Sequence, residues 1–170
     1  MGFSYFIIMA KEIILTQGKV AIVDDDMFDY LNQWKWFANL QGKNFYARTN
    51  IPNKKGKRGS MLMHRLILNI LNSKLQVDHL NHFTLDNRIC NIRICSQSDN
   101  LKNRKISINN SSGYKGVIHI KRNNKFYAKI NVNKKSIYLG LFTNPIDAAR
   151  AYNDAALKYH GEFANINKID

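Results

Sequence analysis

The chain has 170 residues, of which 45% are hydrophobic, enough to bury a core, so its composition excludes a disordered protein. It carries 26 Lys and Arg against 12 Asp and Glu, and this net charge of +14 favours an anionic partner such as nucleic acid. The apolar run at residues 3–10 is too short to span a membrane, so we expect a cytoplasmic protein without a membrane partner.

Short strands and helices are predicted in the first part of the chain. In chain order these are two strands in residues 12–23, a helix from the acidic residues 24–26 to Trp34, a strand from Phe45, and a helix over residues 61–71. The carboxylates of residues 24–26 favour a helix N-terminus, with a metal site as the alternative. The basic segment 52–60 is either a solvated connection or a phosphate contact.

A pattern of polar residues between Val77 and Asn103 indicates a hairpin followed by a helix. Val77 belongs to one short strand, and residues 89–95 form a second strand that returns beside it. Ser96 with Asp99 makes a capping box, which predicts that a helix starts there. Such a hairpin and helix can bring Asp78, His79 and Asn100 together. Neighbouring residues of a regular strand point to opposite faces, so Asp78 and His79 share a site only if the backbone bends.

The residue types in this pattern suit phosphodiester hydrolysis. A histidine can be neutral at pH 7 and accept a proton from water. One carboxylate and one amide can hold a single Mg²⁺ or Mn²⁺ and leave positions open for substrate oxygens.

The whole array resembles the HNH endonuclease family, particularly its phage and intron-encoded homing members. The matching segments are Asp78-His79, Asp86-Asn87-Arg88, Asn91-Ile92-Arg93-Ile94 and Asp99-Asn100. The resemblance implies a ββα-metal fold with His79 as general base, and with Asp78 and Asn100 as metal ligands. It implies that Asn91 holds the loop and so orients His79, and that Arg88 closes the loop and contacts phosphate.

The turn after Asp78-His79 departs from the family pattern because residues 80–84 contain no glycine. Backbone conformations with positive φ are costly without glycine, so we expect a turn of another kind. For His82 we expect a surface loop residue, and the alternatives are an extra contact to phosphate or a replacement metal ligand. The segment 63–67 also resembles one that precedes this nuclease motif. We expect His64 to lie off the core face, and His64 and Arg65 to have a structural or DNA-phosphate role, with direct catalysis as the alternative.

A polar linker at residues 109–113 predicts a boundary between a nuclease domain, residues 1–108, and a second domain, residues 114–170. Three strands are predicted at residues 115–121, 126–132 and 136–142, and then a helix that has Pro145 in its first turn and ends before Gly161. The helix face predicted to cover the sheet consists of Ile146, Ala149, Tyr152, Ala156 and Tyr159.

The second domain is similar to the plant ethylene-response-factor type of DNA-binding domain. The match runs through residues 113–117, 126–130, 138–142, 148–153 and 161–167. The similarity implies a three-stranded antiparallel sheet on one helix, with the exposed sheet face in the major groove. Alternation along the second strand places Ala128, Ile130 and Val132 toward the helix. The DNA-contacting residues predicted here are Lys115, His119, Lys121, Arg122, Lys125, Tyr127, Lys129, Asn131 and Tyr138.

These observations predict an α+β protein of two domains that acts as a metal-dependent, homing-type endonuclease on double-stranded DNA. One active site per chain makes nicking natural for a monomer, whereas a double-strand cut needs a homodimer or two successive events. Two alternatives stay open. One is a sequence-specific DNA-binding protein or repressor with an inactive nuclease module, and the other is a nuclease that acts on RNA or structured DNA.

Overall fold

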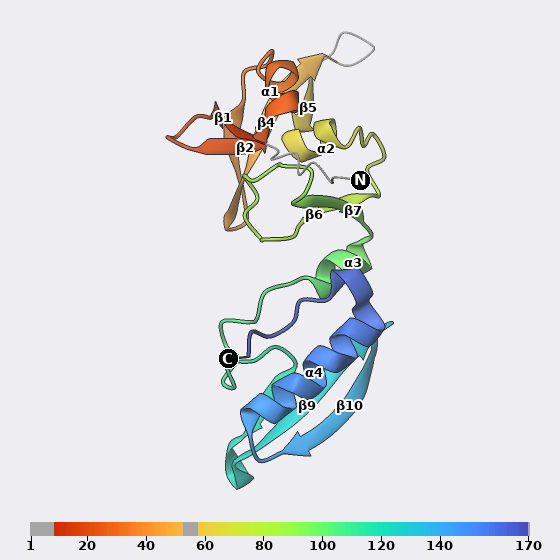
Figure 1. Ribbon diagram of the computed structural model, residues 1–170. Coiled ribbons are helices and arrows are strands. Elements are labelled where there is room, and N and C mark those ends of the chain that lie inside the picture. Colours follow the sequence, from red (N-terminus) through yellow and green to blue (C-terminus); the bar gives the residue numbers. More distant parts are fainter. Residues whose placement is uncertain (1–8, 53–57, 170) are drawn as a thin grey trace, which may run out of the picture. The chain divides into compact units, whose positions relative to one another are not determined.

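The computed structural model describes residues 9–52 and 58–169 and divides the chain into two compact units, the first ending at Ser96 and the second starting at Gln97 (Figure 1). The predicted linker, residues 109–113, therefore lies inside the second unit. The reason is that carbonyl groups of residues 102–104 accept hydrogen bonds from the side chains of Lys115 and Asn165. These bonds join the segment after Ser96 to the second unit.

In residues 9–52 and 58–96, the first unit contains three small antiparallel sheets and two short helices. Its elements are β1 (Ala10–Ile14), β2 (Val20–Asp24), α1 (Asp25–Leu31), β3 (Phe37–Gln41), β4 (Asn44–Pro52), β5 (Arg58–Leu62), α2 (Met63–Ile67), β6 (Gln76–His79) and β7 (Ile92–Cys95). The sheets consist of β1 with β2, of β3, β4 and β5, and of β6 with β7.

The β1–β2 hairpin confirms the two strands predicted in residues 12–23. Gln17 and Gly18 both adopt positive φ in its turn. Along the strands, Ile13 and Val23 are buried in the core while Ile14 is 82% exposed, which is the alternation of a sheet with one buried face.

Several predictions for the first unit were wrong in their boundaries. The strand β3 was not predicted. The helix expected over residues 61–71 covers only Met63–Ile67, because residues 61 and 62 pair with β4 and because Asn69, at φ 51°, ends the helical path. The first helix ends at Leu31 rather than Trp34. Part of the predicted basic loop, residues 53–57, lies outside the described residues.

The second unit has the sheet and helix predicted for it. Its elements are α3 (Gln97–Lys102), β8 (Val117–Ile120), η1 (Lys121–Asn123), β9 (Lys125–Val132), β10 (Lys135–Phe142), α4 (Pro145–His160) and η2 (Gly161–Phe163). The antiparallel strand order is β10-β9-β8. Asn144 caps α4, since its side chain accepts a 2.8 Å hydrogen bond from the Ile146 amide, and Gly161 follows the last residue.

The core of the second unit lies between one face of its sheet and α4. Ala128 and Ile130 are buried against it, as the alternation along β9 predicted. Tyr159 is an exception to the predicted helix face, because it is 40% exposed and Ala155 is buried instead. Gly116, at φ 75°, is required: a Cβ atom there would overlap the Tyr152 ring and lie 2.8 Å from the Lys129 carbonyl oxygen.

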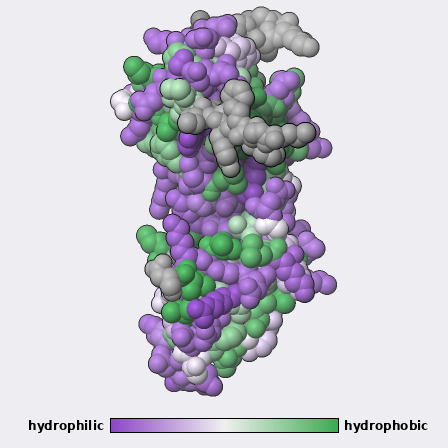
Figure 2. Space-filling view, in the orientation of Figure 1, coloured by the Kyte–Doolittle hydropathy of each residue, from purple (hydrophilic) through white to green (hydrophobic). Residues whose placement is uncertain are grey.

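Among residues 9–52 and 58–169, none of the helices combines the length and apolar character needed to cross a membrane. On the face of the molecule shown in Figure 2, hydrophilic residues cover much of the surface of each unit.

Candidate functional site

The β6–β7 hairpin holds Asp78 and His79 in a buried position. Their exposed fractions are 5% and 4%. His79 is the last residue of β6, so the connecting loop starts directly after it. Asp78 faces Arg93 across the ladder, and the Arg93 Nε and Nη2 atoms both donate to Asp78 Oδ2, at 3.0 and 2.7 Å. Arg93 belongs to the sequence pattern but was given no role, because only the register of the hairpin reveals its partner.

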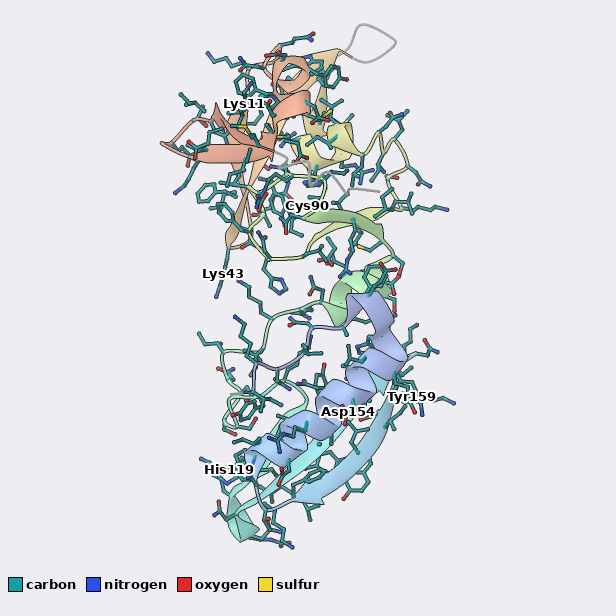
Figure 3. All side chains as sticks on the ribbon, viewed as in Figure 1. Lys11, Lys43, Cys90, His119, Asp154 and Tyr159 are labelled. Atoms are coloured by element: carbon teal, nitrogen blue, oxygen red, sulfur yellow. The ribbon has the colours of Figure 1, made fainter. Side chains whose placement is uncertain are left out.

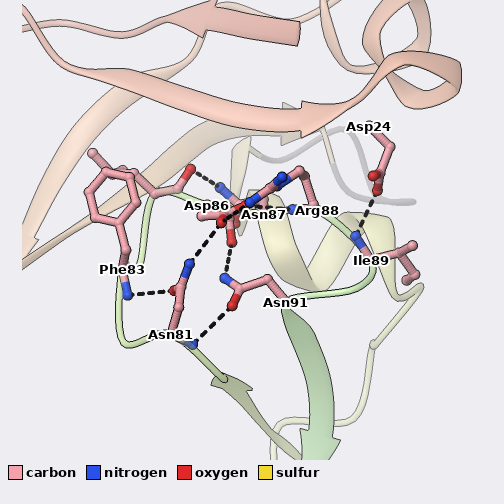
Figure 4. Close-up of polar contacts among 9 residues, drawn as sticks. Asp24, Asn81, Phe83, Asp86, Asn87, Arg88, Ile89 and Asn91 are labelled. Carbon is pink, nitrogen blue, oxygen red and sulfur yellow. Dashed lines mark hydrogen bonds and ion pairs between the residues drawn. The ribbon is translucent and has the colours of Figure 1, made fainter. Parts of the chain in front are cut away.

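Asn91 spans the loop between the two strands (Figure 4). Its Oδ1 atom accepts a hydrogen bond from the Asn81 amide at 3.0 Å, and its Nδ2 atom donates to the Asp86 carbonyl oxygen at 2.7 Å. These are bonds to backbone on both sides of the loop. They provide the geometry expected of a loop-holding asparagine, while its effect on His79 stays a prediction.

Asp86 is the second centre of hydrogen bonds in this loop; it belongs to the matched segment Asp86-Asn87-Arg88, but no role was predicted for it. It is 2% exposed. Its carboxylate accepts hydrogen bonds from Asn81 Nδ2 at 2.8 Å, and from Arg88 Nε and Nη2 at 2.8 and 2.7 Å (Figure 4). Arg88 beside Asp86 outweighs the effect of burial and lowers the pKa of that carboxyl group. Arg88 thus bonds to Asp86 within the loop, while its predicted roles in closing the loop and in contacting phosphate stay predictions.

The rest of the first unit anchors the loop from outside. The Ile22 amide donates to the Leu85 carbonyl oxygen, and the Asn87 amide donates back to Ile22, at 2.8 and 2.7 Å. Asp24, 3% exposed, accepts a 2.6 Å hydrogen bond from the Ile89 amide (Figure 4). The acidic residues 24–26 lie at the N-terminus of α1, as predicted, with Asp24 at the N-cap position, but the Asp24 side chain makes no capping bond there. Its partner is 65 residues away in the chain.

The glycine-free turn does contain a residue with positive φ, contrary to the prediction. His82 adopts φ 61°. Its amide donates to the His79 carbonyl oxygen at 3.0 Å, and Asn81 Oδ1 accepts from the Phe83 amide at 2.8 Å. The turn therefore keeps a left-handed residue and supports it with local hydrogen bonds instead of glycine.

Aromatic rings surround His79. The His64 ring lies 5.2 Å from that of His79 at an interplanar angle of 84°, and the Tyr46 ring contacts both histidines. His64 is 6% exposed, so the expectation that it lies off the core face was wrong. Burial lowers the pKa of His64 to about 3, and burial is also the main cause that lowers the pKa of His79. Both imidazoles are therefore neutral at pH 7.

The guanidinium group of Arg65 is bonded to backbone carbonyl groups of the same unit. Its Nη1 and Nη2 atoms donate to the carbonyl oxygens of Leu75 and Asn72, at 2.8 and 2.6 Å. These bonds close the segment between α2 and β6. These bonds agree with a structural role, which was one of the roles predicted for Arg65.

Asn100 lies in α3 of the second unit, so its pairing with Asp78 on one cation stays a prediction. Lys115 differs from its predicted place on the DNA-contacting face. Its ammonium group donates to the carbonyl oxygens of Lys102 and Arg104, at 2.6 and 2.7 Å, just after the end of α3.

Four of the predicted DNA contacts share the outer face of the sheet, which is the face opposite α4. They are Tyr127, Lys129, Asn131 and Tyr138, placed there by the alternation of β9 and by the register of β10. Lys125 starts β9, and Lys121 and Arg122 lie exposed in η1. His119, labelled in Figure 3, stacks on Phe126 at 4.7 Å, and Phe126 packs against the core below α4. His119 thus belongs to the helix side of the sheet.

Among the described residues, no group of three or more His, Cys, Asp or Glu side chains lies close enough together to hold a metal ion. A carboxylate such as that of Asp78 and the amide oxygen of an asparagine are hard ligands of the kind that Mg²⁺ prefers.

Comparisons with known proteins give one informative match. No protein-family model matches the chain. The chain is 32% identical over 161 residues to an uncharacterized HNH endonuclease of Acanthamoeba polyphaga mimivirus. The alignment covers 91% of this chain and 78% of that relative, so it includes both units.

Proposed function

Because the chain belongs to the HNH endonuclease family, we propose that it is a metal-dependent endonuclease that hydrolyses phosphodiester bonds of double-stranded DNA at a preferred site. One observation carries this proposal: a hairpin buries Asp78 beside His79, and Asn91 ties together the loop that joins its strands. A preorganised, partly dehydrated site of this kind is what hydrolysis of a stable ester needs.

His79 acts as the general base in this proposal. Burial favours its neutral imidazole, which can accept the proton of the attacking water at a ring nitrogen. The rings of His64 and Tyr46 restrict the orientation of the imidazole. Asn91 supports it indirectly, since the loop that it spans starts at the residue after His79.

Asp78 and Asn100 would hold one Mg²⁺ or Mn²⁺. The bound cation would supply positive charge to the scissile phosphate and to the leaving 3′ oxygen. Asp78 presents a carboxylate whose orientation is fixed by Arg93 through its Oδ2 atom. Arg93 also keeps positive charge beside this carboxylate, where a phosphate can approach.

The second unit selects the site and holds the DNA, in line with its similarity to ethylene-response-factor domains. Residues 111–170 carry 10 Lys and Arg against 4 Asp and Glu. The exposed outer face of the sheet offers Lys129 for phosphate and Asn131 for base edges. The proposal assigns chemistry to the first unit together with Asn100, and recognition to the outer sheet face.

A nicking assay tests the activity. Supercoiled plasmid is incubated with the full chain in Mg²⁺, in Mn²⁺ and in EDTA, and the conversion to nicked and linear forms is followed on gels. We expect conversion with either cation and none in EDTA. Single-stranded DNA and RNA of the same length serve as competitors, and we expect duplex DNA to inhibit most strongly. Plasmid that stays supercoiled in both cations would contradict the proposal.

A second candidate is a DNA-binding protein whose nuclease module is inactive. The ion pair between Arg93 and Asp78 favours it, because a guanidinium group on the carboxylate competes with a cation. The variant Arg93→Gln separates the two candidates. It removes the competing charge, so cation-dependent nicking that appears only in this variant would identify the wild-type module as inactive.

A further inference from the structure

The outer face of the second unit's sheet has an apolar centre, formed by Ile118, Tyr127, Tyr138 and Leu141. The register places Ile118 and Leu141 on either side of Tyr127, in β8 and β10. Tyr138 pairs with Lys129 in the next row, and its ring centroid lies 5.1 Å from that of Tyr127. The exposed fractions of Ile118, Tyr138 and Leu141 are 44%, 57% and 42%. The side chains of these four neighbouring residues form an apolar strip across the three strands, on the face opposite α4.

Positive charge surrounds this apolar centre. Residues 117–142 contain six Lys and Arg and no Asp or Glu. Within residues 111–170, the four acidic residues lie in or after α4 in the sequence, as Asp154 does in Figure 3. A partner of the sheet face must therefore be anionic at its edges and apolar at its middle. A hydrated phosphate surface alone would leave the apolar strip without a partner.

The major groove of duplex DNA has this distribution of charge. Three antiparallel strands at a spacing of about 4.8 Å span about 10 Å, which fits a groove about 12 Å wide. Phosphates line the groove, and the apolar group on its floor is the C5 methyl of thymine. Asn131, exposed on the same face, can pair with the adenine edge of an A·T pair. The tyrosine rings contact each other, so no unpaired base fits between them.

We propose that this sheet face selects thymine-containing duplex sites by burying thymine C5 methyl groups against Ile118, Tyr138 and Leu141. The inference rests on the proposed function, since it requires that the chain binds duplex DNA. It names the chemical group on the DNA that the sheet face recognises, the thymine methyl group. The similarity to other DNA-binding domains does not identify this group.

Replacement of thymine by uracil tests this inference, because uracil lacks only the C5 methyl group. Bound sequences are enriched from a random duplex library with the full chain in EDTA, and the best site is synthesised with thymine and with uracil. We expect the dissociation constant to rise about fourfold for each contacted thymine that becomes uracil. Equal affinity for the two duplexes would overturn the inference alone, whereas a lack of binding to any duplex would overturn the proposed DNA recognition as well.

Two leucine variants show whether the sheet face reads the methyl group. Leu141→Ser removes apolar surface from the strip, while Leu157→Ser removes a leucine of α4 that is 57% exposed. We expect Leu141→Ser to lose part of the discrimination between thymine and uracil, and Leu157→Ser to keep all of it. The comparison is made between variant proteins that have equal melting temperatures. Equal discrimination by both variants would overturn the inference, because it would assign the effect to uracil-containing DNA itself or to another surface. Stronger binding of single strands than of duplex would overturn it too.

Discussion

The two surfaces that we assign to DNA are built in opposite ways. In the first unit, Asp78, His79 and Asn91 are each at most 5% exposed and lie in or beside a loop fixed by side-chain hydrogen bonds. On the outer sheet face of the second unit, Tyr138 is 57% exposed and its neighbours project from adjacent antiparallel strands. One surface is buried and tightly bonded, and the other is open.

This difference corresponds to two demands. Bond cleavage requires reacting groups held in one geometry, so each lost hydrogen bond in the loop should lower the rate of cleavage with little effect on DNA affinity. Recognition by an exposed sheet face spreads over many contacts, so each substitution there should change affinity modestly and leave the rate at saturation unchanged. The predictions below test this separation.

Among substitutions outside the reactive pair Asp78 and His79, the largest effect should follow from Asn91→Ala. This substitution removes the hydrogen bonds to the Asn81 amide and to the buried Asp86 carbonyl oxygen, and the buried carbonyl left without this partner costs about 1–3 kcal/mol. We expect the single-turnover rate of cleavage to fall about 100-fold or more, with DNA affinity within about twofold of wild type. Asn50→Ala, at an exposed position of β4, is the matched control. A wild-type rate for Asn91→Ala would show that the loop needs no such bridge.

A smaller loss should follow from Asp24→Ala, which removes the hydrogen bond to the Ile89 amide from outside the motif. We expect destabilisation of the first unit by about 1–3 kcal/mol and a cleavage rate about tenfold lower. Asp24→Asn keeps an oxygen acceptor and should recover most of the loss, whereas the exposed Asp26→Ala should cost at most the small favourable interaction of a first-turn carboxylate with the helix dipole and leave the cleavage rate unchanged. Thermal unfolding and single-turnover kinetics measure the two quantities. Equal behaviour of Asp24→Ala and Asp26→Ala would contradict the anchoring role.

Lys129→Ala tests the other surface. Loss of one phosphate contact should weaken duplex binding a few-fold and reduce the slope of log affinity against log salt concentration by about 1. The cleavage rate at saturating protein should stay unchanged. Lys158→Ala, at an exposed position of α4, is the control for the loss of one positive charge. If both variants change the salt dependence equally, the contact is general electrostatic attraction and the sheet face has no special role.

The smallest effect concerns the left-handed turn residue. His82 has φ 61°, where a residue with a Cβ atom is strained by about 1 kcal/mol relative to glycine. His82→Gly should therefore be more stable than His82→Ala by about that amount. At Lys74, an exposed position of negative φ, the order of the glycine and alanine variants should reverse. Urea unfolding of the four variants measures the differences.

The elements that sequence patterns predicted best were those with one buried face. Alternation placed Ala128 and Ile130 against α4 because each strand of that sheet has a helix on one side only. The cap at Asn144 and the terminal Gly161 delimited α4 for local reasons. By contrast, β3 was missed because its run of residues, Phe37–Gln41, is short and contains Ala38 and Asn39, two residue types that are depleted in strands.

The partners around the candidate site were not predictable, because they depend on contacts between distant segments. Asp24 bonds to Ile89 across 65 residues, and nothing local to Asp24 indicates this. The contact of His64 with His79 joins α2 to β6 through tertiary packing. Arg93 required the register of the hairpin. Sequence patterns therefore predicted the reactive residues of the proposed mechanism, whereas only the structure revealed the residues that surround them.

The most direct test of the account is the cleavage rate of His79→Ala. Supercoiled plasmid is cut in Mg²⁺ under single-turnover conditions by wild type, by His79→Ala and by His160→Gln, which changes a buried histidine of the second unit. We predict that His79→Ala cleaves about 100- to 10,000-fold more slowly than wild type while binding duplex DNA with equal affinity, and that His160→Gln retains the wild-type rate. A wild-type rate of cleavage for His79→Ala would contradict the account.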